Sequence, residues 1–397
     1  MSEPFMRCAN MSGPGEQLNR RERFLNVALF GKPDRIPLGV GGVRPLTRKA
    51  WLKQGLPEDQ DVVDYLGFRD CTIGSRSFVT YPSEGFAWKP NPNAVNLGPD
   101  PPFEHRILES DERYRIWTDS LGITQRGFQE DWKDGWMGFA TRVFMDFPVK
   151  TREDFERIKR RYDAADPDRY PSDWDRIAAE FRDRDYPVCV TIRGPFWWTR
   201  DMTGLKKIVT GIYREPEFIK ELMDFCAEFQ IQVLERAFTD VEVDAVILNE
   251  DMGYKNGPMI GPDSVMEFMG EAYKMMSDFL RGHGVRVILV DSDGNCEPLI
   301  PVWLKLGING ITPNEAMAGM DVVKLGRRFP HLVMMGGIDK TRLARGREAI
   351  REEVMYKVPP LVKRGGYFPG VDHAVPPDIS LENFSYFVSL LRELCGW

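Results

Sequence analysis

Two aspartates, Asp291 and Asp293, directly follow a run of aliphatic residues over 287–290, and Gly294 comes next. The aliphatic run predicts a fully buried β-strand, because short runs of this kind are typical of strands covered on both faces. A desolvated carboxylate costs free energy unless it is paired or bound to a metal ion. An acid pair at the end of a core strand therefore indicates a functional site.

Polar residues follow the other predicted strands at matching places. In a parallel α/β protein the carboxyl ends of the strands meet at one edge, where ligands bind. We therefore predict that these residues line one pocket, although helix capping or loop hydrogen bonding explains each of them taken alone. The set comprises Arg193, Asn249, Glu250, Asp251, Asn314, Glu315, Asp339 and His373.

His373 is one of only four histidines and follows a predicted strand. With Asp291 and Asp293 it could form a metal site, since imidazole and carboxylates are suitable ligands for zinc and other transition metals. It could equally be a general acid whose pKa is raised by neighbouring carboxylates. A third interpretation is a histidine that is hydrogen-bonded to the loop backbone.

Three aromatic residues, Phe196, Trp197 and Trp198, come just after the strand that ends at Arg193. Aromatic side chains at such a place either pack beneath a loop or form the wall of a flat ligand site. Trp132 and Trp136 are candidates for the same wall.

The positions of these residues depend on a regular alternation of strands and helices that begins near residue 185. Helices are predicted over 216–238 and from about 263 to 282, where apolar residues recur at helical spacing. This order fits a (β/α)8 barrel, with a doubly wound sheet as the alternative. The predicted strands are 188–195, 244–251, 285–293, 308–315, 331–339 and 366–373.

The predicted barrel forms one domain over residues 19–397, after a flexible tail over 1–18. Residues 81–150 are rich in proline and glycine and contain the alternating run Tyr114, Ile116, Trp117. They predict an irregular, partly β insert. The helical pattern resumes with Thr151 as its N-cap.

The 397 residues are 42% hydrophobic and carry a net charge of −7, with no basic run. This composition is that of an ordinary globular protein and argues against nucleic acid as a partner. The chain has no apolar run that could cross a membrane, and its start does not resemble a signal peptide. The six cysteines are scattered without a C-x-x-C motif. They indicate reduced thiols and a cytoplasmic location.

Several short motifs, in order, resemble the uroporphyrinogen decarboxylase superfamily over roughly residues 20–395. The superfamily implies a (β/α)8 barrel with its pocket at the C-terminal mouth. It includes a cofactor-free decarboxylase and corrinoid- or thiol-linked methyltransferases. The motifs are R-E-R-F-L and K-P-D-R-I-P near the start, G-P-F at 194–196, S-D-G-N at 292–295, G-G-I-D at 336–339 and V-P-P-D-I-S-L-E-N at 375–383.

The decarboxylase branch carries an arginine-rich segment after the first strand, and here residues 39–48 keep only Arg44 and Arg48. The methyltransferase branch carries a zinc site with one histidine and two cysteines. On that pattern Asp291 takes the histidine position, while Asp293 and His373 take the cysteine positions. The resemblance thus implies a divalent metal, with zinc favoured, or no metal at all, and Glu250 is a candidate fourth member.

The resemblance favours a methyltransferase that demethylates a small methoxylated or methylated compound, with an aromatic one expected. An acid or a metal ion at the barrel mouth would activate the leaving group. The methyl group would pass to a corrinoid carried by a separate protein, with the catalytic residues drawn from Asp291, Asp293, His373 and Glu250. The first alternative is a decarboxylase of a carboxylated pyrrole or aromatic acid, with Arg44, Arg48 and Arg193 holding carboxylates. The second is a non-catalytic protein that binds a tetrapyrrole or small aromatic compound. The resemblance also suggests a homodimer.

Overall fold

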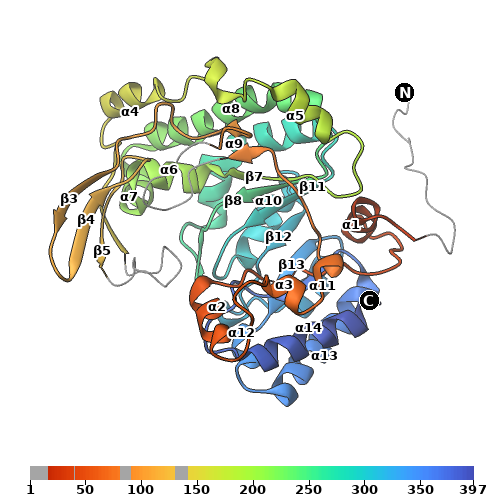
Figure 1. The fold of residues 1–397 in the computed structure, drawn as a ribbon. Helices are drawn as coiled ribbons and strands as arrows, with labels where there is room; N and C mark the ends of the chain where they lie inside the picture. The colour runs from red at the N-terminus through yellow and green to blue at the C-terminus, as the bar shows by residue number, and fades with distance from the viewer. Residues whose placement is uncertain (1–16, 40, 81–90, 130–141) are drawn as a thin grey trace, which may run out of the picture.

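The computed structural model describes residues 17–39, 41–80, 91–129 and 142–397. Within these ranges the largest sheet has six strands, all parallel, and their order across the sheet is their order along the chain (Figure 1). A doubly wound sheet reverses its strand order at a switch point. The uniform order excludes that alternative. The strands are Cys189–Arg193 (β7), Ala245–Asn249 (β8), Val287–Asp291 (β11), Gly310–Thr312 (β12), Val333–Ile338 (β13) and Tyr367–Val371 (β14).

Short extended segments from the first part of the chain lie beside the two outer strands. The Gly39 N–H donates to Pro369 of β14 over 2.9 Å, and the Leu38 N–H donates to Cys71 over 2.7 Å. Arg76 in turn is bridged in parallel to Val188, just before β7. These segments occupy the places that the first two strands of a barrel would take. A closed ring of eight strands stays a prediction.

Helices occupy most of the connections between the parallel strands (Figure 1). The two predicted helices are confirmed as α8 and α9, each with a proline at its first position. Thr151 caps α4 as predicted. The helices are Arg20–Ala28 (α1), Pro45–Leu52 (α2), Val62–Tyr65 (α3), Arg152–Lys159 (α4), Trp174–Glu180 (α5), Pro195–Thr203 (α6), Leu205–Arg214 (α7), Pro216–Asp240 (α8), Pro262–Gly282 (α9), Ile300–Lys305 (α10), Val322–Arg328 (α11), Lys340–Leu343 (α12), Arg347–Arg364 (α13) and Leu381–Leu394 (α14).

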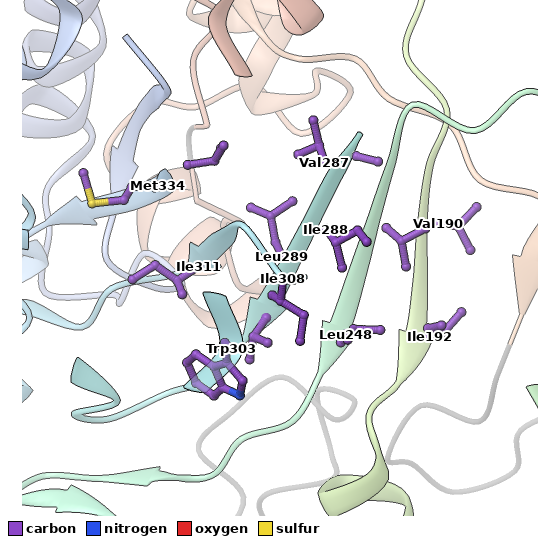
Figure 2. Packing of buried hydrophobic residues seen from close by; sticks show 14 of the residues in the cluster. Val190, Ile192, Leu248, Val287, Ile288, Leu289, Trp303, Ile308, Ile311 and Met334 are labelled. Atoms are coloured by element: carbon purple, nitrogen blue, oxygen red, sulfur yellow. The ribbon is translucent and has the colours of Figure 1, made fainter. Parts of the chain in front are cut away.

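The core lies on both faces of the parallel sheet. All four aliphatic residues of the run over 287–290 are fully buried. Figure 2 shows Val287, Ile288 and Leu289 packed beside Leu248 of the neighbouring strand β8, with Val190 and Ile192 of β7 on the far side of β8. Burial of aliphatic side chains on both faces stabilises the strands and makes any carboxylate at their ends conspicuous.

A second, antiparallel sheet projects to one side of the parallel sheet (Figure 1). The alternating run at 114–117 lies in its second strand, as the pattern of a small sheet predicted. Its strands are Arg106–Ser110 (β3), Tyr114–Thr118 (β4), Thr124–Phe128 (β5) and Arg142–Asp146 (β6). Two short pairs complete the strands, Val79–Thr80 (β1) with Val95–Asn96 (β2) and Gly253–Tyr254 (β9) with Gly257–Pro258 (β10).

Some predictions fall outside the described residues. These are most of the predicted tail over 1–18, and Trp132 and Trp136 of the proposed aromatic wall. Among the helices that the structure describes, none is long and apolar enough to span a membrane.

Candidate active site

Three polar side chains stand side by side where β7, β8 and β11 end. The sheet register places Arg193 beside Asn249, and Asn249 beside Asp291. Residues in register on adjacent parallel strands point to the same face. Arg193 Nη1 donates to Asn249 Oδ1, and Asn249 Nδ2 donates to Asp291 Oδ2 over 3.0 Å. The amide thus links a guanidinium to a carboxylate across three strands.

The Asp291 carboxyl has a pKa raised to about 7. Burial is the main cause, and the charge of Asp251 adds to it. The Asn249 hydrogen bond and the Arg193 charge act in the opposite direction. Burial penalises the ionised form more than these two partners stabilise it, so Asp291 is only partly ionised at neutral pH.

Asp293 and His373 lie together, as predicted, although 80 residues separate them in the chain. Asp293 Oδ2 is 3.4 Å from His373 Nε2, and the side chains are 39% and 33% exposed. The pKa of Asp293 is raised to about 8, first by burial and then by the charges of Asp251, Glu315 and Asp291. A carboxyl group with this pKa keeps its proton at neutral pH and can donate it.

The general-acid alternative supposed a raised pKa for His373, and the net shift has the opposite direction. Its pKa is lowered, mainly by burial and then by the positive charge of Lys340. Glu315 and Asp251 raise this pKa but do not outweigh these two causes. His373 is therefore a neutral imidazole at pH 7. The chain holds it closely, since a Cβ at Gly41 would lie 2.4 Å from the His373 carbonyl oxygen.

The three predicted metal ligands do not form a metal site. Across the ranges that the structure describes, no group of three or more histidine, cysteine, aspartate or glutamate side chains is placed to hold a metal ion. Asp291 is directed into the row with Asn249, whereas Asp293 faces His373. The donor set also lacks a thiolate: Cys296 is buried beside Ser292, and its pKa is raised to about 12. The residues present do not fit the zinc site that the resemblance implied.

Glu250 lies inside the protein and holds the start of α6. It is fully buried, and its Oε2 accepts the Trp197 N–H over 2.9 Å while its Oε1 accepts the Tyr273 hydroxyl. The residue before α6 is Gly194, where a Cβ would lie 2.1 Å from the Glu250 Cδ. Burial raises the Glu250 pKa to about 7. These contacts make Glu250 a positioning residue, in contrast to the predicted catalytic role.

The three predicted aromatic residues divide between core and site. Phe196 is fully buried in the hydrophobic core, and Trp198 packs there against Tyr162 and Phe225. Trp197 is different, because the guanidinium groups of Arg193 and Arg200 lie over its ring. The predicted aromatic wall is therefore wrong for Phe196 and Trp198, because their side chains pack in the hydrophobic core.

Other predicted site residues take structural positions. Asp339 caps α12 by accepting the Thr341 N–H over 2.8 Å. Asn314 has a positive φ of 65° and donates to the Met335 carbonyl, while its Oδ1 is buried without a partner. Capping accounts for Asp339 without a ligand.

Two charged residues connect the mouth to the loops around it. Asp251, with φ of 50°, accepts the Asp293 N–H over 3.0 Å, and Glu315 accepts the Gly294 N–H over the same distance. Both carboxylates are thus tied to the loop that carries Asp293.

Sequence reasoning missed Lys340 and Arg200. Lys340 Nζ lies 3.3 Å from Asp372 and 3.6 Å from Glu315. Arg200 follows Trp197 by three residues on α6, a spacing that places two side chains on the same helix face. The spacing from Trp197 could have predicted Arg200 from the sequence. No sequence pattern predicts Lys340, because only the tertiary structure brings it beside Glu315 and Asp372.

The fold and this site define a parallel α/β protein with an aspartate of raised pKa beside a histidine of lowered pKa at the carboxyl ends of its strands. The model of the family "Uroporphyrinogen decarboxylase (URO-D)" matches residues 140–394, which is more than half of the chain. The chain belongs to this family. Its members are built on a (β/α)8 barrel, which agrees with the parallel sheet seen here.

A solved structure with a similar fold is a methyltransferase from Methanosarcina mazei, with a TM-score of 0.55 and 13% sequence identity. The match covers 95% of this chain and 99% of that chain. A D-tagatose 3-epimerase-like protein matches at 14% identity over 63% of this chain and 99% of its own. Its TM-score of 0.29 is too low to indicate a common fold. No curated protein matches the chain in sequence.

Proposed function

We propose that this protein is a methyltransferase that takes the methyl group from a small methoxylated compound and passes it to a corrinoid on a separate protein. The observation that carries the proposal is the Asp293 carboxyl 3.4 Å from His373 Nε2 at the mouth, among carboxylates that raise its pKa. Family membership and the fold shared with a methyltransferase support it.

The reaction breaks the bond between the methyl carbon and the ether oxygen, and that oxygen leaves with the bonding electron pair. An alkoxide or aryloxide is a poor leaving group, so a proton must reach the oxygen as the bond breaks. Asp293 supplies this proton and becomes a carboxylate. His373 Nε2, 3.4 Å away, then returns a proton from solvent. The corrinoid, when bound, supplies the cobalt nucleophile that accepts the methyl group.

Purified protein tests this proposal directly. Incubation with a panel of methoxylated compounds and cob(I)alamin should produce methylcobalamin, followed by its absorbance, together with one equivalent of the demethylated alcohol or phenol. Absence of methyl transfer from every member of a broad panel of aromatic and aliphatic ethers would contradict it.

A decarboxylase of an aromatic or pyrrole acid is the second candidate, favoured by the family match. In that reaction Asp293 protonates the carbon that loses carbon dioxide. Of the three arginines predicted to hold substrate carboxylates, Arg48 does not support this candidate. Its guanidinium donates to the Glu58 and Gln60 carbonyls instead. Carbon dioxide release from such acids without any corrinoid would distinguish this candidate from the methyltransferase.

A further inference from the structure

The turn of the β9–β10 hairpin carries an asparagine that is directly followed by a glycine. Tyr254 pairs with Gly257 across the hairpin, which leaves Lys255 and Asn256 as its two-residue turn. Both turn residues are exposed, and Tyr254 is 69% exposed. A two-stranded hairpin this short is only marginally stable by itself, so its tip opens easily. Asn256 thus lies on an accessible and weakly held piece of backbone.

An asparagine followed by a glycine is able to react within the chain, and asparagine is a thermolabile residue for this reason. The backbone nitrogen of the glycine attacks the side-chain Cγ, and a new C–N bond forms. The Cγ–Nδ2 bond breaks, and the side-chain amide takes the proton of the attacking nitrogen and leaves as ammonia. Water then opens the resulting succinimide ring at either carbonyl. The products are an aspartate and an isoaspartate, whose backbone runs through the former side-chain carbonyl carbon.

The surroundings of Gly257 leave room for this attack. A Cβ at this position would meet no atom within 4 Å, and the residue has a φ of 145°. Glycine adopts such a conformation readily, whereas a side chain would be strained there, so the turn itself requires a glycine after Asn256. None of the described residues forms a hydrogen bond with the Asn256 side chain. No such bond therefore holds its Cγ away from the Gly257 nitrogen.

The sequence contains one other asparagine–glycine pair, Asn309–Gly310, and the fold holds that pair in place. Asn309 Oδ1 accepts the Ile288 N–H over 2.8 Å, and Asn309 Nδ2 donates to the Arg286 carbonyl over 2.9 Å. Gly310 lies in β12, where a Cβ would be 2.9 Å from the Leu289 Cγ. The same dipeptide thus occurs once in an open turn and once in the packed sheet.

The hairpin rests directly on the loop that carries Asp293. The Asn295 N–H donates to the Tyr254 carbonyl over 2.9 Å. A Cβ at Gly253 would lie only 2.2 Å from the Asp293 carbonyl oxygen. The two backbones are therefore in contact, and a change in the shape of the hairpin reaches the loop of the site.

We propose that Asn256 is a site of spontaneous deamidation, and that the reaction alters the rim of the mouth. Both products add a negative charge beside a site that already contains several carboxylates. The isoaspartate also lengthens the backbone by one carbon, which is incompatible with a two-residue turn that pairs Tyr254 with Gly257. The hairpin then loses its register, and the contact with the Asp293 loop loosens.

Peptide mass mapping of the full chain after incubation in mildly alkaline buffer tests the modification. The peptide that contains Asn256 should gain the mass difference between an amide and a carboxylic acid. It should separate into two products, one of which co-elutes with the same peptide from Asn256→Asp. Deamidation at Asn309 should be at least about tenfold slower, because a buried strand opens far less often than a hairpin tip. In urea the two pairs should react at similar rates.

Asn256→Gln is the matched variant, because its longer side chain would have to close a larger ring, and its peptide should keep its mass. Equal rates for the two pairs in the folded chain would overturn the proposal. An unchanged mass at Asn256 in the folded chain, with reaction of both pairs in urea, would overturn it as well.

Hydrogen exchange tests whether the modification reaches the site loop. In the incubated chain, the peptide that contains Asn295 should exchange several-fold faster than in incubated Asn256→Gln, because its amide loses the Tyr254 carbonyl as acceptor. Identical exchange in a fully deamidated sample would contradict the effect on the rim. Neither measurement needs a methyl donor or a corrinoid, so both are independent of the proposed function.

Discussion

Asp293 and Asp372 are two acids beside the same lysine, yet their surroundings assign them different roles. Asp372 is fully buried and accepts the Ala316 and Lys340 N–H groups over 3.0 and 3.2 Å. Burial raises the pKa of Asp372, while Lys340 Nζ at 3.3 Å and the two N–H groups oppose this shift. Asp293 instead faces the charges of three carboxylates and a neutral histidine.

The difference shows what separates a structural acid from a proton carrier at a strand end. Backbone N–H groups and a cation stabilise the ionised form, whereas burial among other acids stabilises the protonated form. Asp372 belongs with Glu250 and Asp339, which also accept backbone N–H groups. Asp291 and Asp293 form the other group.

The largest expected effect concerns the proton of Asp293. Asp293→Asn keeps the shape of the side chain but removes the acid, so methyl transfer should fall by about 100-fold or more, the usual contribution of general acid catalysis. The measurement is the initial rate of methylcobalamin formation. Asp321→Asn is the matched control, because Asp321 caps α11, accepts the Tyr356 hydroxyl and pairs with Lys324 on the surface. A variant with more than half of the original rate would remove Asp293 from the mechanism.

The next effect concerns Glu250, which belongs to the structural group. Glu250→Ala leaves the Tyr273 hydroxyl and the Trp197 N–H without their buried acceptor, so the free energy of unfolding should fall by roughly 3 kcal/mol. Urea unfolding measures it. Tyr273→Phe removes one of these bonds and should cost about 1 kcal/mol. A smaller loss in Glu250→Ala than in Tyr273→Phe would argue against the positioning role.

A pH-dependent effect is expected from Asp291. Its carboxyl keeps a proton up to about pH 7 in the folded chain but releases it near pH 4 when unfolded. Between these pH values the unfolded state binds fewer protons, so the free energy of unfolding falls as the pH rises. Asp291→Asn removes this loss, so its Tm should exceed that of the parent chain by more at pH 8 than at pH 5. An equal difference at both pH values would show that burial does not control this group.

The smallest effect concerns Asp339, which the sequence placed in the pocket and the structure places at the start of α12. Asp339→Ala should lower the free energy of unfolding by about 1 kcal/mol, as expected for the loss of an N-cap. Asp321→Ala, at the cap of α11, should cost a similar amount. Thermal unfolding of both variants shows whether the two losses of stability are similar. An unchanged stability of Asp339→Ala would contradict the capping role and favour the predicted role in ligand binding.

Local sequence pattern was sufficient for most of the fold. All six predicted strands are present, because runs of aliphatic residues bounded by polar residues have few alternatives to a buried parallel strand. The helices over 216–240 and 262–282 follow from apolar spacing, and each begins at a proline, which is suited to a first helical turn. The early segments around Leu38 and Arg76 form isolated bridges, to Thr72 and Val188, and such bridges leave no pattern of this kind in the sequence.

The sequence alone determined which residue types stand at the strand ends, and hence that Asp293 and His373 could do chemistry together. Only the tertiary structure decided which carboxylates meet N–H donors and which meet other carboxylates. It placed Glu250 under α6, joined Asp291 to Asn249, and brought Lys340 close enough to lower the pKa of His373. The physical reason is that a pKa depends on burial and on charges a few ångströms away, and these neighbours are distant in the chain.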